Sequence, residues 1–528
     1  MSNENSFSRR QFLKVTAITG GGMLVGFSIF ENAAAADAPV LPFAPNAYIK
    51  IGTDGVITLM APNPEIGQGV KTSLPMIIAE EMCVDWKKIK IEPAPTESKF
   101  GSQTAGGSGS VRSRFTPLRM IGATTRDLFI NAAAQTWNVS ATECFADNGF
   151  VIHKPSGKKL SYGELANKAA TLPIPTNSTL KDPKDFKFIG TRIKDVDAKA
   201  IVTGQPLYGA DMRHKNMLIA VVARPPAFGK ALKSVDETES LKVNGVKQVV
   251  KLKNSVAVLA TTTWAAIKGR DALQLVWEDA GKLEDSADYE HEFRNLLAKG
   301  GATPARNDGD VDKALAGATK VLEAVYEVPP IAHAQMEPLN FFANVTDGKA
   351  ELYGPTQVPA SVQRQVAQQL GIPVENITLG MPRQGGGFGR KLQPDNGVEA
   401  ALISAAAKCP VMVQWTREDD MQNDFYRPAA MFKYRAAITD GKLVAWHQQM
   451  AGINGSRGSD TYIAGALPNY RAEGYSLVSN IRTGAWRAPG PNTLAFAAES
   501  FLDELCVELK RDPIEFRLEM LDKIKQNP

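Results

Sequence analysis

Short runs of alternating apolar and polar residues recur along the chain, and several of them flank two-residue turn signals. Tyr48-Ile49-Lys50-Ile51 and Val56-Ile57-Thr58-Leu59 lie on either side of Asp54-Gly55. Alternation with a period of two is typical of a strand with one buried face, and Asp-Gly or Asn-Gly between two such runs predicts a β-hairpin. The same turn signal occurs at Asn148-Gly149, Asp347-Gly348 and Asp440-Gly441.

Helical patterns lie between these hairpins. The stretch 123–137 places Leu128, Phe129, Ala132, Ala133 and Trp137 on one face. Ser161 and Glu164 form a capping-box pattern, and Gly371 is a plausible C-terminal glycine. Further helices are predicted at 73–83, 165–170 and 362–370, and after Asp512-Pro513. Residues 173–178 resemble a linker, and residues 281–310 form a polar, Gly-punctuated, looser segment. The pattern predicts an α+β, multi-domain protein with mixed sheets.

Composition narrows the class of protein. The chain has 528 residues, 44% hydrophobic and 22% charged, with a formal net charge of +4. These values are typical of a multi-domain globular protein, and the mature region has no dense Lys/Arg block, which argues against nucleic acid as a partner. None of the four cysteines is spaced as CxxC or in an iron–sulfur run, so any iron–sulfur cluster is expected on another chain, whereas disulfides stay open.

The N-terminus has the pattern of an export signal. Arg9-Arg10 is followed by a mildly apolar stretch from Val15 to Phe30 and by the small residues 33–36. Residues 1–36 are therefore predicted to be a twin-arginine signal peptide, with a general secretory signal as the alternative. The twin-arginine route carries folded proteins, so the signal favours a complex cofactor and a periplasmic location. No other stretch reaches 18 apolar residues, so at most peripheral membrane contact is expected.

Two Gly-rich motifs are the candidates for ligand binding. Pro64-Glu65-Ile66-Gly67-Gln68-Gly69 leads into the predicted helix 73–83, whose N-terminus favours anions. Gln384-Gly385-Gly386-Gly387-Phe388-Gly389-Arg390-Lys391 contains three consecutive glycines, which suit positive φ or a close backbone approach. The second motif is neither a dinucleotide fingerprint nor a Walker loop, because its spacing matches neither. Each motif alone is equally compatible with a structural turn.

Taken together, these motifs resemble the molybdenum-binding subunits of the xanthine dehydrogenase and aldehyde oxidase family, in particular the isoquinoline 1-oxidoreductase β-subunit branch. The segments His333-Ala334-Gln335-Met336-Glu337-Pro338, Thr416-Arg417-Glu418-Asp419-Asp420 and Trp486-Arg487-Ala488-Pro489-Gly490 also match that pattern. The resemblance implies an N-terminal part of the second molybdopterin-binding domain at 37–180. It further implies an α/β hammerhead domain at 186–280 and the first molybdopterin-binding domain at 305–528.

The resemblance also implies the cofactor, its contacts and the partners. The cofactor would be molybdenum–molybdopterin in a cytosine dinucleotide form, with no protein side chain on the metal. Its expected contacts are Gly67, Gln68, Gly69, Gly386, Gly387, Phe388, Gly389 and Arg487. Arg487 has a surface ion pair as its alternative role, and His333 is expected to be a packed core histidine. Arg390 and Lys391 are expected either to meet cofactor phosphates or to face solvent. The implied partners are a [2Fe–2S] small subunit, a cytochrome c subunit and a small-molecule substrate.

Three departures from the family pattern shape the functional prediction. Ile331 and Leu392 occupy positions where purine-oxidising relatives carry Gln and Glu, which argues for an aldehyde or a less polar N-heterocycle such as isoquinoline. The Glu of the family's late GxGE segment, its general base, is not found, so no catalytic residue is assigned. The remainder of the second domain is expected to be missing, through truncation, frameshift or a separate chain. The chain alone is therefore expected to be inactive. The alternatives are a non-catalytic cofactor-binding remnant and a periplasmic solute-binding protein.

Overall fold

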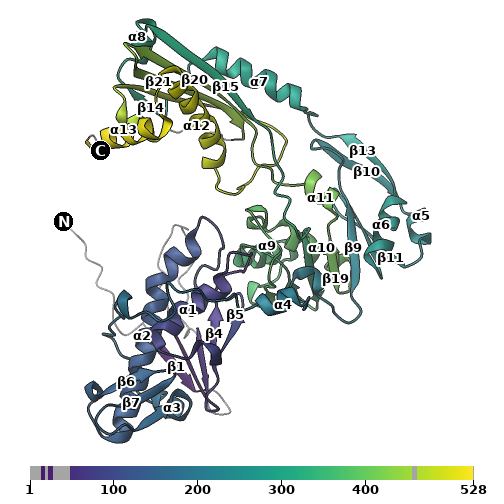
Figure 1. Cartoon of the computed structure of the whole chain (residues 1–528). Helices are drawn as coiled ribbons and strands as arrows, with labels where there is room; N and C mark the ends of the chain where they lie inside the picture. The colour runs from purple at the N-terminus through teal and green to yellow at the C-terminus, as the bar shows by residue number, and fades with distance from the viewer. Residues whose placement is uncertain (1–12, 18–21, 28–47, 455–460, 527–528) are drawn as a thin grey trace, which may run out of the picture.

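The chain folds into three sheet-based modules that follow one another in an arc (Figure 1). The computed structural model describes residues 13–17, 22–27, 48–454 and 461–526. We call the modules the N-terminal module (residues 13–169), the middle module (209–280 and 340–422) and the C-terminal module (286–328 and 430–526). Within the described residues, no helix is long and apolar enough to cross a membrane.

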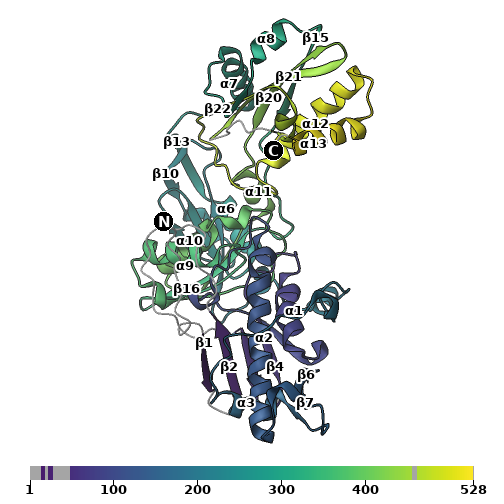
Figure 2. The same ribbon diagram turned by 90° about the vertical axis from the view of Figure 1, so that its left-hand side faces the viewer.

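The N-terminal module is a five-stranded sheet covered by two long helices. Its strands, in spatial order, are β1 (Leu13–Ala17), β2 (Gly22–Phe27), β3 (Ile49–Gly52), β4 (Ile57–Ala61) and β5 (Ile89–Pro93). Helices α1 (Val70–Met82) and α2 (Gly109–Trp137) lie side by side over this sheet (Figure 2). A small sheet of β6 (Cys144–Asp147), β7 (Phe150–His153) and β8 (Lys159–Ser161), together with α3 (Tyr162–Ala169), completes the module.

The predicted signal segment is described only in part. Arg9 and Arg10 lie outside the described residues. The backbone of β1 and β2 forms an antiparallel pair, and β2 pairs in turn with β3. The prediction of export is not tested by this arrangement.

The middle module is a seven-stranded mixed sheet. Its order is β11 (Val246–Lys251), β12 (Val256–Ala260), β9 (Leu218–Ala223), β19 (Val411–Gln414), β16 (Asn340–Thr346), β17 (Lys349–Tyr353) and β18 (Ile377–Gly380). Strands β9 and β19 pair in parallel, so one sheet joins the predicted hammerhead domain to the domain predicted to follow it. Helix α4 (Ala198–Val202) precedes this module in the chain. The other elements of the module are β10 (Lys230–Asp236), α5 (Thr238–Lys242), α6 (Thr263–Asp271), β13 (Gln274–Asp279), α9 (Pro359–Leu370), α10 (Asp395–Ala407) and α11 (Arg417–Gln422).

The C-terminal module is a five-stranded sheet with helices on both faces. Its order is β14 (Arg306–Asp308), β22 (Asn469–Leu477), β21 (Lys442–Ile453), β20 (Ala430–Thr439) and β15 (Lys320–Val328). Helices α7 (Ser286–Lys299) and α8 (Val311–Ala316) pack on β21, whereas α12 (Pro491–Glu508) and α13 (Pro513–Gln526) enclose a separate aromatic core. Tyr434, Trp446 and Phe501 are fully buried in that core and contact one another edge-on or stacked.

The predicted hairpins and most predicted helices are confirmed. All four turn signals connect paired antiparallel strands, and in three of them both turn residues have positive φ. The capping box of Ser161 and Glu164 is present at α3, and Gly371 ends α9 with φ 65°. Helices α1 and α2 begin earlier than expected, at Val70 and Gly109.

The expectation of a loose segment over residues 281–310 is wrong, because the 14-residue helix α7 lies within it. Asp285 caps this helix by accepting from the N–H groups of Ala287 and Asp288. Phe293 and Leu297, one turn apart, are its buried residues. The sequence contains both the capping Asp285 and the apolar pair, but the many charged residues around them made the segment look like a loop.

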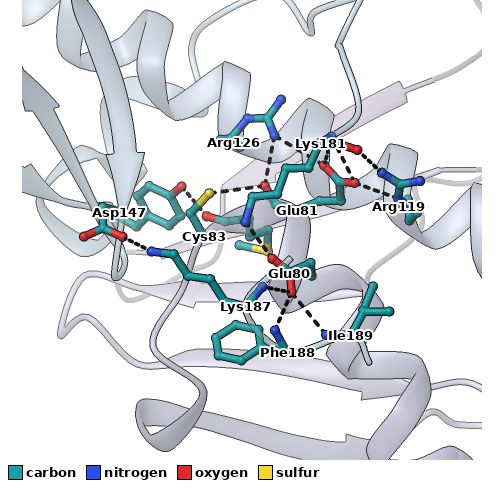
Figure 3. A network of polar contacts seen from close by, with 12 residues as sticks. Glu80, Glu81, Cys83, Arg119, Arg126, Asp147, Lys181, Lys187, Phe188 and Ile189 are labelled. Carbon is teal, nitrogen blue, oxygen red and sulfur yellow. Dashed lines mark hydrogen bonds and ion pairs between the residues drawn. The ribbon is translucent and has the colours of Figure 1, made fainter. Parts of the chain in front are cut away.

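Two buried carboxylates anchor the chain that leaves the N-terminal module (Figure 3). Glu80 and Glu81, at the end of α1, are fully buried. Glu80 pairs with Lys181 at 2.7 Å and accepts from the N–H of Phe188 at 2.6 Å. Burial opposes ionisation of Glu80, but these contacts outweigh it and lower its pKa. Glu81 pairs with Arg119 at 2.7 Å. The segment after the predicted linker is thus fixed to α1.

Candidate functional site

Three Gly-rich loops from two modules meet at the candidate site. They are residues 64–69 before α1, residues 103–109 before α2, and residues 384–389 after β18. The N–H of Gln384 donates to the carbonyl of Glu65 at 2.9 Å. Gln357 connects the other pair of loops, because its side-chain Nε2 donates to the carbonyl of Ala105 at 2.6 Å and its Oε1 accepts from the N–H of Gly389 at 3.2 Å. Motifs far apart in sequence are therefore neighbours in space.

The first loop is closed on itself. The Glu65 carboxylate accepts from the N–H groups of Gly67 (2.8 Å), Gly69 (3.0 Å) and Lys71 (2.9 Å). The expectation that the start of this helix is open to a ligand anion is therefore wrong, since the chain's own carboxylate occupies it. The Gln68 side chain also contacts its own loop, accepting from the N–H of Ile66 at 2.7 Å and donating to the carbonyl of Pro64 at 3.0 Å. Contact of Gln68 with a pterin stays a prediction, and each amide atom of Gln68 keeps one further hydrogen-bonding position for it.

The glycines of the 385–389 loop are required by protein packing. A Cβ on Gly385 would lie 2.4 Å from Glu337 Cβ, one on Gly387 2.6 Å from Gln357 Oε1, and one on Gly389 1.8 Å from the Ala485 carbonyl oxygen. The expectation that Gly387 and Gly389 mainly leave room for a ligand is therefore incomplete. A branched residue at 387 would disturb folding as well as cofactor binding.

The centre of the same loop presents unpaired donors. Within the described residues, the backbone N–H groups of Gly386, Gly387 and Phe388 have no hydrogen-bond partner. Phe388 has a φ of 54°, an unusual conformation for a bulky residue, and the residue is 39% exposed. Such strain is common at binding sites, where a rigid surrounding structure maintains it. The loop is thus built to offer N–H groups to oxygen atoms of a ligand.

A strap from the C-terminal module, residues 482–490, closes over this loop. The N–H of Arg487 donates to the carbonyl of Phe388 at 2.8 Å, and its guanidinium lies 5.1 Å from the centre of the Phe388 ring. The indole N–H of Trp486 donates to the carbonyl of Ala332 at 3.2 Å. The alternative of an Arg487 surface ion pair is not found in the part of the chain that the structure describes. The predicted residues 386–389 and 487 do lie together.

Arg390 and Lys391 do not take either of their expected roles. Arg390 is buried and pairs with Asp395 at 2.7 Å and Asp424 at 2.9 Å. Lys391 is fully buried beside Glu337 at 3.2 Å, and burial lowers its pKa. Both expectations, phosphate contact and solvent exposure, are wrong because the two side chains are buried and paired with carboxylates of the chain itself. The two cations therefore fix the end of the 385–389 loop through buried ion pairs.

His333 is a packed core histidine, as expected. Its side chain is fully buried, with Nδ1 2.9 Å from the Asp424 carboxylate and Nε2 2.8 Å from the Ala485 carbonyl. Burial opposes ionisation of Asp424, but hydrogen bonds and charge from His333 outweigh it and lower the Asp424 pKa. His333 therefore ties the 385–389 loop region to the strap rather than facing a ligand.

Sequence reasoning missed the buried amides around the loops. Asn63, Gln335 and Gln384 are each at least 96% buried, and each has at least one side-chain atom without a partner: Oδ1 of Asn63, both amide atoms of Gln335, and Oε1 of Gln384. Buried polar atoms usually have partners, so three orphans around one site point to a ligand that supplies them. Together with the open N–H groups, they fit a pterin, which is rich in donors and acceptors. The sequence offered only a weak signal for this role: a carboxamide can both donate and accept hydrogen bonds. The positions of these three residues in the sequence did not indicate that they would gather at one site.

Two further features bear on the choice of site. A cavity of about 360 Å³ is lined by Arg224, Trp415 and Arg482, among others, but by none of the predicted cofactor contacts. Within the described residues, no group of three or more His, Cys, Asp or Glu side chains is placed to hold a metal ion. The converging loops are therefore the better candidate.

Comparisons with known proteins agree with this geometry. Models of the molybdopterin cofactor-binding domain match residues 6–202 and 294–521. The membrane-bound aldehyde dehydrogenase [pyrroloquinoline-quinone] of Gluconacetobacter polyoxogenes is 31% identical, over 98% of this chain and 72% of its own length. The chain belongs to the xanthine dehydrogenase and aldehyde oxidase family. This membership confirms the predicted family and excludes the solute-binding alternative.

Two further comparisons support the enzyme class and the fold. Isoquinoline 1-oxidoreductase subunit beta of Brevundimonas diminuta is 27% identical, over 91% of this chain and 70% of its own length. The crystal structure of quinoline 2-oxidoreductase from Pseudomonas putida 86 matches with a TM-score of 0.52 at 19% identity, over 62% of this chain and 50% of that one, and supports the α+β fold. The chain is thus a molybdenum hydroxylase-type oxidoreductase subunit with a molybdenum cofactor. The match that begins at residue 6 overlaps the predicted signal peptide.

Proposed function

We propose that this chain is the molybdopterin-binding subunit of a hydroxylase that oxidises an aldehyde or an N-heterocycle, such as isoquinoline, with oxygen taken from water. The observation that carries the proposal is the row of three unpaired N–H groups at residues 386–388. The bound cofactor would supply a redox-active metal. This chain would supply the N–H donors of the loop at residues 386–388. The buried ion pairs of Arg390 and Lys391 and the contact of Arg487 with Phe388 would hold that loop in place.

Apolar side chains support the proposed substrate class. Ile331 and Leu392 stand where purine-oxidising relatives carry Gln and Glu. The Leu392 side chain lies against Gly106, a short distance from the Gln357 contact. A purine would lose its hydrogen-bond partners there, whereas an aldehyde or a less polar heterocycle would not. The names of the relatives above, an aldehyde dehydrogenase and an isoquinoline oxidoreductase, point to the same two classes.

The electron acceptor and the cellular location belong to the same proposal. The four cysteines are spread over all three modules, so electrons would leave through a [2Fe–2S] small subunit and, beyond it, a cytochrome c subunit. The cofactor would be the cytosine dinucleotide form, and export would use the twin-arginine route. Replacing Arg9 and Arg10 with Lys should leave the protein in the cytoplasm, and fractionation with immunoblotting checks this. Continued periplasmic accumulation would contradict the proposed route.

The cofactor test must separate two possibilities, because one relative's name carries pyrroloquinoline quinone and the matching domain models describe molybdopterin. We expect the purified chain to contain molybdenum by elemental analysis, a pterin by fluorescence after oxidation, and a cytidine nucleotide by mass spectrometry. Quinone without molybdenum would refute the proposal. Gly386→Ala should reduce the molybdenum content, because it strains the loop at φ 96° beside Phe388. Gly348→Ala, strained at φ 70° in an open turn, is the matched control.

Activity is tested on a complex of this chain with the iron–sulfur partner and a fragment that carries the family's late GxGE segment, whose Glu is the general base not found in this sequence. Isoquinoline and aromatic aldehydes are supplied in ¹⁸O-labelled water, and labelled oxygen is expected in the product. Label from dissolved oxygen instead would contradict the proposed reaction. A loaded complex that turns over neither substrate class would favour the alternative of a non-catalytic cofactor-binding remnant.

A further inference from the structure

The segment 333–337 points alternate side chains into the protein beneath the 385–389 loop. His333 and Gln335 are buried, with exposed fractions of 5% and 1%, and the Glu337 side chain is 9% exposed. The two outer residues are fully engaged: His333 with Asp424, and Glu337 with the N–H of Gly385 at 2.8 Å. Between them, neither amide atom of Gln335 has a partner.

The position of Gln335 is fixed by its backbone. Its carbonyl accepts from Arg417 Nη2 at 2.6 Å, so the residue cannot turn outward without breaking a charge-assisted bond. Its side chain lies against Gly386: a Cβ on Gly386 would be 3.4 Å from Gln335 Cβ and 3.2 Å from the Phe388 ring. The side chain that carries the unpaired amide therefore starts beside Gly386, one of the residues whose N–H groups are unpaired.

A buried carboxamide without partners costs folding free energy, and proteins keep such groups where a ligand completes them. We propose that the Gln335 amide hydrogen-bonds the ligand held by the 385–389 loop and recognises a lactam-type edge, in which an N–H stands beside a C=O. A carboxamide offers one acceptor and one donor side by side, which is the complement of that edge. The inference rests on the proposed function, because a pterin and the lactam product of an oxidised N-heterocycle are the two sources of this edge.

The test compares Gln335→Met with Gln363→Met, both in the full chain. Gln363 is the matched control, since its amide is satisfied by the carbonyl of Ile377 at 3.1 Å. In cofactor-free protein, Gln363→Met should lower the melting temperature, whereas Gln335→Met should leave it unchanged or raise it, because the orphan amide is removed. A loss of stability in Gln335→Met equal to that of the control would overturn the proposal, since it would reveal a structural partner.

Measurements on protein that contains the cofactor then show whether the pterin or the reaction product supplies the lactam-type edge. If the pterin supplies it, Gln335→Met should lower molybdenum and pterin content by about tenfold, the effect of losing roughly one hydrogen-bonded pair. If the product supplies it, cofactor content should stay at the wild-type level and binding of 2-pyridone, measured by calorimetry, should weaken by about tenfold. Unchanged cofactor content together with unchanged 2-pyridone binding would refute the inference alone. Wild-type protein without molybdenum would instead refute the proposed function.

Discussion

Arg487 and Phe388 contact each other through both backbone and side chain: the N–H of Arg487 donates to the Phe388 carbonyl at 2.8 Å, and the guanidinium lies 5.1 Å from the centre of the ring. The backbone bond fixes the strap to the loop. The cation over the ring restrains the one bulky side chain that the loop exposes. This pair therefore couples the C-terminal module to the candidate site in the middle module.

Replacing Arg487 with Gln should loosen the loop without detaching the strap, because the backbone bond remains. Loss of an exposed cation–π contact costs about 0.5–1 kcal/mol, measured by urea unfolding. We expect molybdenum content to fall in this variant, because the Phe388 ring is no longer restrained. Arg487→Lys keeps a cation, so its free energy of unfolding and its molybdenum content should both fall less than those of Arg487→Gln. Equal values for the Gln and Lys variants would show that the charge has no part in holding Phe388.

Glu65→Gln should destabilise the loop at residues 64–69. The carboxylate accepts three N–H groups, and a carboxamide has only one accepting atom, so its NH₂ would face a backbone donor. We expect a loss of about 2 kcal/mol in the free energy of unfolding, since hydrogen bonds to charged groups are the stronger class. Glu65→Asp keeps the charge but shortens the reach, and should lose less. A Gln variant as stable as wild type would contradict the role of Glu65 as the acceptor of this loop.

The contrast between Asp54-Gly55 and Arg390 shows which parts of the molecule can be predicted from sequence. The four turns were predictable because a tight turn depends on the conformations of two adjacent residues. The partners of Arg390 and Lys391 were not predictable, because Asp424 and Glu337 reach them only through the tertiary fold. The same holds for Glu65: its carboxylate competes with any ligand for the N–H groups, and a motif alone does not reveal that competition.

The meeting of the two Gly-rich motifs was expected from the family resemblance, and the bond between Glu65 and Gln384 places them together. The resemblance implied that the glycines leave room for a ligand, but it did not indicate that the protein itself needs them. Residues larger than glycine do not fit at 387 and 389, because a Cβ there would overlap Gln357 and the Ala485 carbonyl. Packing of this kind depends on a side chain from one distant segment and a backbone carbonyl from another, so no single motif contains the information.

Asp420 should make the folded protein more stable as the pH falls from 7 to 4. Burial raises its pKa to about 6, although the N–H of Leu339 and the charge of Arg417 act in the other direction. Because the folded-state pKa lies above the unfolded value, the folded protein binds more protons between about pH 4 and 6. The stabilising contribution is complete below about pH 4 and is lost as the pH rises through 6.

The measurement compares wild type with Asp420→Asn, whose carboxamide can still accept from Leu339 and does not titrate. The wild-type free energy of unfolding minus that of the variant should rise by roughly 2–3 kcal/mol from pH 7 to pH 4. Other titrating groups cancel in the subtraction. A difference that stays flat or falls over this range would show that Asp420 ionises as an ordinary carboxyl.

The isolated chain is expected to bind the cofactor but not to hydroxylate a substrate. Hydroxylation with water needs a positioned base, which typically contributes roughly 10² to 10⁴-fold to the rate. The two carboxylates beside the loops are already engaged: Glu65 with three backbone N–H groups, and Glu337 with Gly385 and Lys391. Each would have to break these bonds to take a proton.

The chain with its cofactor bound is assayed with isoquinoline or an aldehyde and an artificial electron acceptor, and turnover should be absent. Addition of the iron–sulfur partner should not restore it, because that partner supplies electron transfer and not a base. Turnover by the isolated chain that is abolished in Glu337→Gln would contradict this prediction and identify Glu337 as the base.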